Sequence, residues 1–91
     1  MKINAYAVFD EVAQTHATPF FAPNDEVAKR HFRFSLKNLD EIFISDFVLW
    51  RVGDFDIENG VFSNSFYVID SGKNVLSDRE IEEENSEVKQ L

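Results

Sequence analysis

Four of the nine cationic side chains fall within nine consecutive residues: Lys29, Arg30, Arg33 and Lys37. Under helical spacing, Arg30, Arg33 and Lys37 lie on one face. Cations in such a row can contact successive phosphates of a nucleic acid. The same row is typical of a solvated helix face, because cations are favoured near a helix C-terminus. The residues alone leave both interpretations open, and the solvated face is the commoner pattern.

Aromatic side chains are the second feature that could recognise a nucleic acid. The chain has ten Phe, two Tyr and one Trp in 91 residues. Unpaired bases stack on exposed aromatic rings, and a small core cannot bury so many rings. We therefore expect some rings at the surface or between two copies of the chain. The net charge of −8 argues against unspecific nucleic-acid binding, so any contact must be local.

The residue types do not support an enzyme, a metal site or a cofactor site. There is no cysteine, and His16 and His31 lack a ligand spacing. The acidic segment 54–60 resembles a calcium loop only superficially, because its glycine is one position late and Ser65 stands where a bidentate glutamate is needed. No nucleophile motif or glycine-rich phosphate loop is present. We therefore expect a protein that is not an enzyme.

Hydrophobic periodicity and turn signals predict the elements that position these side chains. Asn24 is a predicted N-cap, and Asp25 and Glu26 suit the first turn of a helix. Asn59-Gly60 is a strong signal for a two-residue hairpin turn. The predicted elements, in chain order, are a strand at 2–9, a loop at 10–18, a helix at 24–37, a connection at 39–45, and strands at 46–55 and 61–69.

This β-α-β-β order predicts a two-layer α+β domain over residues 1–72, with one helix over a small mixed sheet. The first two strands are expected to be parallel, with a right-handed crossover through the helix. A sheet of three strands has open edges, so we expect a homodimer to complete it. No apolar run approaches the about 20 residues of a membrane span, so no membrane association is expected.

The segment 73–91 is predicted to be an acidic tail, either a frayed helix or disordered. It holds three cations and six acids, a net charge of −3. Its apolar content is only Ile81, Val88 and Leu91 beyond Val75 and Leu76, too little to anchor an independent helix.

Two separated motifs resemble the small nonstructural protein of gokushoviruses, which are single-stranded-DNA phages of the Microviridae. The resemblance covers residues 1 to about 62, including Phe9-Asp10 at the end of the first strand. The first motif is Thr18-Pro-Phe-Phe21 followed by Asn24-Asp25, Ala28, Arg30 and Phe32; the second is Phe47-x-Leu49-Trp50-Arg51-Val52-Gly53-Asp54-Phe55-Asp56, then Gly60. The acidic tail has no counterpart in the pattern.

The resemblance implies a DNA-binding, nonstructural protein that acts in viral genome replication or packaging in the bacterial cytoplasm. Arg30 and Arg51 lie within its motifs, and Lys29, Arg33 and Lys37 cluster beside Arg30. Our first hypothesis is that these cations bind single-stranded DNA phosphates while exposed rings stack on bases. The alternative is a dimeric protein-interaction module that binds a phage or host replication or assembly protein without contacting DNA. A third hypothesis is that the acidic surface mimics DNA.

Overall fold

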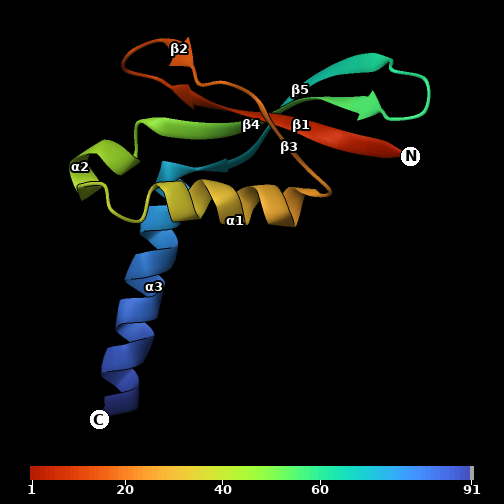
Figure 1. Ribbon diagram of the computed structural model, residues 1–91. Helices are drawn as coiled ribbons and strands as arrows, with labels where there is room; N and C mark the ends of the chain where they lie inside the picture. The colour runs from red at the N-terminus through yellow and green to blue at the C-terminus, as the bar shows by residue number, and fades with distance from the viewer. Residues whose placement is uncertain (91) are drawn as a thin grey trace.

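The structure is a computed structural model that describes residues 1–90, with the side chains of residues 1–83. It is an α+β fold with one antiparallel sheet and three helices, which confirms the predicted class (Figure 1). The elements are β1 (Lys2–Asp10), β2 (Thr15–His16), β3 (Phe20–Ala22), α1 (Asp25–Ser35), α2 (Glu41–Ile44), β4 (Phe47–Asp56), β5 (Phe62–Ser71) and α3 (Gly72–Gln90).

The sheet has the strand order β2-β1-β4-β5, and β3 also pairs with β1. All of its strand pairs are antiparallel, so the predicted mixed sheet with parallel first and second strands is wrong. The reason is β3, a short strand that the sequence pattern did not predict. It pairs Ala22 with Asn4, so the chain has already returned to the start of β1 before α1 begins. The helix then runs back along the sheet, and β4 returns antiparallel, with Phe47 opposite Asp10.

Helix α1 begins and ends close to where the sequence predicted. The Asn24 side chain accepts a hydrogen bond from the Val27 backbone N–H at 2.9 Å, as an N-cap does. Ala28 and Phe32 are buried on the side facing the sheet, and Leu36 follows as the buried C-cap residue. This spacing buries one stripe of the helix and leaves the opposite stripe in water.

The connections hold more structure than the sequence indicated. Residues 39–45, predicted as a plain connection, contain the short helix α2, which buries Ile44 completely. The predicted hairpin is confirmed, but its loop is longer than the two residues expected: the Asp56 backbone N–H donates to the Val61 carbonyl at 2.9 Å, which leaves residues 57–60 in the loop. Gly60 has a φ of 73°, which glycine adopts without strain. Asp56 accepts backbone hydrogen bonds from Glu58 and Asn59 at this turn, and these bonds lower the pKa of its carboxyl group.

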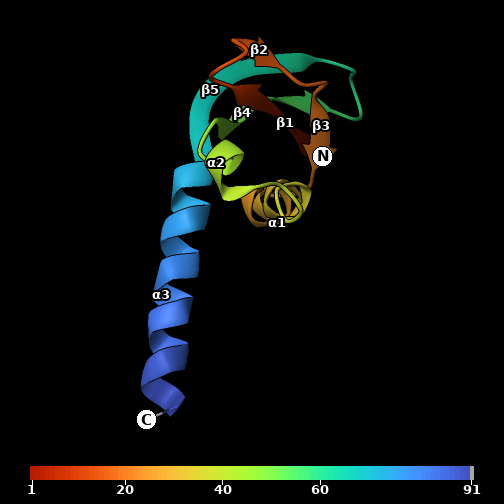
Figure 2. The ribbon, with the colours of Figure 1, turned by 90° about the vertical axis from the view of Figure 1, so that its left-hand side faces the viewer.

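The core lies between α1 and one face of the sheet (Figure 2). Its largest fully buried side chains are Tyr6, Phe32, Ile44 and Leu49. Val75 of α3 belongs to the same cluster, so the packed region continues past residue 72, where we expected the domain to end. Gly72 is required at this junction, because a Cβ atom would collide with the carbonyl group of Ile44.

Helix α3 leaves the body after this junction and projects away from the sheet (Figures 1 and 2). The expected tail is therefore helical as far as Gln90, and Leu91 lies outside the described residues. None of the helices over residues 1–90 is long and apolar enough to cross a membrane.

Candidate nucleic-acid interface

The five cations predicted to meet phosphates do not form one surface. All five are on α1, just after it, or on β4, yet the fold places them in different surroundings. Two of them, Arg33 and Arg51, are engaged with acidic or polar partners inside the protein. The remaining three lie on the outside of α1 and its C-terminal end.

Arg33 is held by two carboxylates. Its Nε donates to Asp70 at 2.8 Å, and its Nη1 donates to Asp78 at 2.7 Å. Burial of Asp70 would raise the pKa of that carboxyl group, but the hydrogen bonds from Arg33, the Ser71 backbone N–H and Asn74 outweigh burial and lower it. The bond to Asp70 in turn raises the pKa of the Arg33 guanidinium. Arg33 therefore ties α1 to β5 and α3 and is not available as a free cation.

Arg51 lies on the face of the sheet that α1 covers. Its Nη2 donates to the side-chain oxygen of Asn4 at 2.8 Å, and its Nη1 lies 3.6 Å from an oxygen of Asp25. The guanidinium also lies over the Tyr67 ring, 5.6 Å from its centroid. These contacts join β1, β4 and β5 to the first turn of α1, so Arg51 positions the helix.

Tyr6 completes this polar cluster at the start of α1. Its hydroxyl donates to Asp25 at 2.6 Å and accepts from the Asn4 amide at 3.2 Å. Burial, followed by the bond to Asp25, raises the pKa of Tyr6 to about 12. The hydroxyl therefore stays protonated at neutral pH and holds the N-terminal end of the helix against the sheet.

The outer side of α1 keeps two exposed cations, Arg30 and Lys37. Neither has an ion-pair partner among residues 1–83. The Nζ atom of Lys29 lies 3.4 Å from Oε1 of Glu26, and an exposed ion pair of this kind contributes little to stability. Phe34 lies between the two in sequence, and its side chain is 75% exposed. Residues 30 and 34 are one turn apart and therefore lie on the same side of the helix. Lys37 follows directly after the C-cap Leu36, in a turn whose Lys37 backbone N–H donates to the Phe34 carbonyl.

Phe34 is the residue of this face that our sequence reasoning did not single out. The signal was present, because Phe32 and Phe34 point about 160° apart under helical spacing. Since Phe32 is 1% exposed, Phe34 must point toward water. We call Arg30, Phe34 and Lys37 the α1 outer face.

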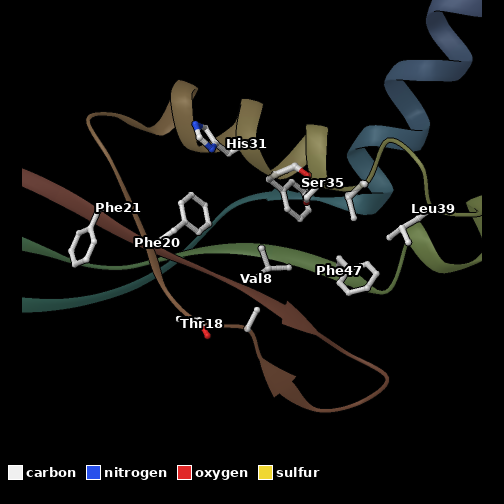
Figure 3. A pocket seen from close by; sticks show the side chains of 11 residues that line it. Val8, Thr18, Phe20, Phe21, His31, Ser35, Leu39 and Phe47 are labelled. Atoms are coloured by element: carbon white, nitrogen blue, oxygen red, sulfur yellow. Dashed lines mark hydrogen bonds between the residues drawn. The ribbon is translucent and has the colours of Figure 1, made fainter.

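An apolar pocket of about 470 Å³ lies next to this face, between α1 and the sheet (Figure 3). His31 and Ser35 approach it from the helix, whereas Val8, Phe20 and Phe47 approach it from the strands. The Phe20 ring stacks near-parallel to His31, with centroids 6.1 Å apart, and also stacks on Tyr6. No charged carboxylate, lysine or arginine lines this pocket. Nothing in the sequence pattern indicated it, because its walls come from four separate segments.

The family model described as Phage ORF5 protein matches residues 3–75. The chain belongs to this family. No curated protein and no solved structure matches the chain. The matched residues run from β1 to Val75, the last residue of the core cluster. All five predicted cations, the α1 outer face and the pocket therefore lie within the family match, whereas α3 beyond its first turn lies outside it.

Proposed function

We propose that this phage accessory protein contacts single-stranded DNA through the α1 outer face. The observation that supports the proposal best is the arrangement of Arg30 and Lys37, which flank an exposed Phe34 and have no ion-pair partner among residues 1–83. Two cations can meet two phosphates, and the ring offers a stacking platform that any base accepts. A duplex keeps its bases stacked inside, so the ring favours single strands.

The proposed interface is smaller than the sequence predicted, because Arg33 and Arg51 are engaged internally. Two phosphate contacts on a protein of net charge −8 give weak, strongly salt-dependent binding. Such binding fits a protein that acts where single-stranded DNA is abundant. The resemblance to gokushovirus nonstructural proteins supports a role in genome replication or packaging in the cytoplasm of the bacterial host.

Replacing the two exposed cations together tests the proposal. We expect Arg30→Met with Lys37→Met to weaken binding of a fluorescent single-stranded oligonucleotide at 20 mM salt. Over 20–300 mM salt, the plot of the logarithm of the association constant against the logarithm of the salt concentration has a negative slope. The magnitude of this slope should decrease by about 1.4 in the variant, because each lost phosphate contact removes about 0.7. The control is Lys29→Met with Lys73→Met, which changes the net charge equally. The proposal fails if the wild type does not bind at 20 mM salt, or if both double variants weaken binding alike.

Phe34→Ala tests the stacking part of the same proposal. Loss of one stacked base costs about 1–3 kcal/mol, which corresponds to roughly 5-fold or more in affinity. Because Phe34 is exposed, the free energy of unfolding should stay within about 0.5 kcal/mol of the wild type. An unchanged affinity would mean that the protein binds phosphates without stacking.

A dimeric protein-interaction module is the second candidate function. The face of the sheet that is turned away from α1 favours it. On this face Phe66 is 70% exposed and lies beside Phe9, His16 and Trp50, while β5 pairs on one side only among the described strands. An exposed apolar cluster at a sheet edge is typical of a protein contact. Analytical ultracentrifugation should show a concentration-dependent dimer that Phe66→Ser weakens and Val12→Ser does not. A monomer at every concentration would contradict the dimer.

A further inference from the structure

The pocket beside the α1 outer face is open, aromatic and empty of charge. Its exposed lining residues form the mouth: His31 and Ser35 on α1, together with Thr18, Phe21 and Leu39. The rings of Phe20, Phe32 and Phe47 are buried or half-buried. A volume of about 470 Å³ is in the range of sites that take a flat small-molecule group. A phosphate would find no cation inside, so the pocket suits an uncharged ring and not the backbone of a nucleic acid.

The mouth adjoins the proposed DNA-binding face along the same helix. His31 follows Arg30 and Ser35 follows Phe34, so each of these mouth residues is rotated by about 100° from a residue of the α1 outer face. His31 also lines the shallow hollow that Arg30 and Phe34 share. A strand whose phosphates meet Arg30 and Lys37 therefore passes the pocket mouth.

The polar groups at the mouth match the edge of a base. The Ser35 hydroxyl donates to the Phe32 carbonyl and still has lone pairs that can accept a hydrogen bond. The Thr18 hydroxyl and the His31 ring are the other polar side-chain groups of the lining. Few polar groups placed around a stacking surface are what a pocket for a splayed base requires.

We propose, on the basis of the function proposed above, that the pocket takes one unpaired nucleobase of the bound DNA strand. The base stacks among Phe20, Phe32 and His31, and its sugar-phosphate stays outside against the cations of the α1 outer face. Charge favours this occupant: Arg30 shares a hollow with His31, which also lines the pocket, on a protein whose net charge is −8. A second copy of this acidic chain lacks a phosphate to place there.

Fluorescence of 2-aminopurine tests the inserted base directly. A single 2-aminopurine in a short thymidine oligonucleotide should be quenched when the wild type binds, because an inserted base stacks on rings. Ser35→Phe should block the mouth, weaken binding about tenfold and remove most of the quenching, while the salt slope stays unchanged. Ser35→Ala and the exposed control Asn38→Phe should behave like the wild type. Quenching should survive in Phe34→Ala, since the α1 outer face is separate from the pocket.

The outcomes separate this inference from the proposed function. If Ser35→Phe binds and quenches like the wild type, the pocket does not take a base, although the α1 outer face can still bind DNA. The same holds if an oligonucleotide of abasic sites binds as tightly as the thymidine strand, because phosphates alone are then recognised. If the wild type binds no oligonucleotide at 20 mM salt, both proposals fall.

Discussion

Arg30 and Arg33 are the same residue type, one turn apart on α1, and the fold gives them opposite roles. Arg33 contacts Asp70, which is 2% exposed, and Asp78 in the second turn of α3. Arg30 is exposed and has no ion-pair partner among residues 1–83. The partners of Arg33 lie 37 and 45 residues away in sequence, so no local pattern distinguishes the two arginines. A row of cations on a helix therefore indicates a phosphate-binding surface only for those cations that form no ion pair within the folded protein.

Removing Arg33 should give the largest effect and should separate it from Arg30. Arg33→Met leaves the buried Asp70 carboxylate without its cation, so we expect the free energy of unfolding to fall by about 2–3 kcal/mol. Arg30→Met, with the same change in charge and shape, should alter it by less than about 0.5 kcal/mol. Urea unfolding of both variants measures the difference. Equal stabilities would mean that the Asp70 contact contributes nothing.

The contribution of the Arg33–Asp70 ion pair should also depend on pH, with a smaller effect on the free energy of unfolding than the substitution itself. The pKa of the Asp70 carboxyl group is lower in the folded protein than in the unfolded chain, where it is about 3.9. The ionised carboxylate therefore adds to the free energy of unfolding above about pH 3.9, and this addition is lost as the pH falls from that value toward the folded pKa. In Arg33→Met the main lowering contact is gone, so burial is opposed only by the hydrogen bonds from Ser71 and Asn74, and the folded pKa of Asp70 is higher than in the wild type. We therefore expect the stability gap between wild type and Arg33→Met to narrow below about pH 4 in urea unfolding series. A gap that stays constant from pH 7 to pH 3 would contradict the ion pair.

The acidic side of α3 should give the smallest effect, through repulsion of DNA. Helix α3 begins beside the C-terminal end of α1, where Asp78 contacts Arg33, and Glu80 and Glu83 follow on it. We expect Glu80→Gln with Glu83→Gln to raise oligonucleotide affinity about twofold at 20 mM salt and not at 300 mM, because salt screens the repulsion. Glu11→Gln with Glu58→Gln is the matched control. Equal gains from both pairs would show a net-charge effect with no role for position.

Local signals predicted the local elements well. The Asn24 cap, the helix that follows and the hairpin at Gly60 depend on a few neighbouring residues, and the structure confirms them, although the hairpin loop spans residues 57–60 and not two residues. The direction of β4 could not be read in this way. It depends on β3, a strand of three residues whose pairing with β1 has no periodic pattern of its own. Short strands and the helix α2 form because the fold supplies partners for them.

The candidate site was predicted in part. Helix α1 was the right element to examine, but which of its cations remain at the surface depends on Asp70 of β5 and Asp78 of α3, which pair with Arg33. Phe34 was recoverable from helical spacing. The pocket was not, because it arises where β1, the segment before α1, α1 itself and β4 meet.

Helix α3 beyond Val75 has a geometric consequence for anything it contacts. Residues 76–90 form a continuous helix whose first turn is fixed in the core, so their length is about 22 Å at 1.5 Å per residue. A continuous helix is a stiff spacer, unlike a flexible linker, which samples many distances. A molecule recognised by the last turns of α3 would therefore be held at a set distance and in a set direction from α1.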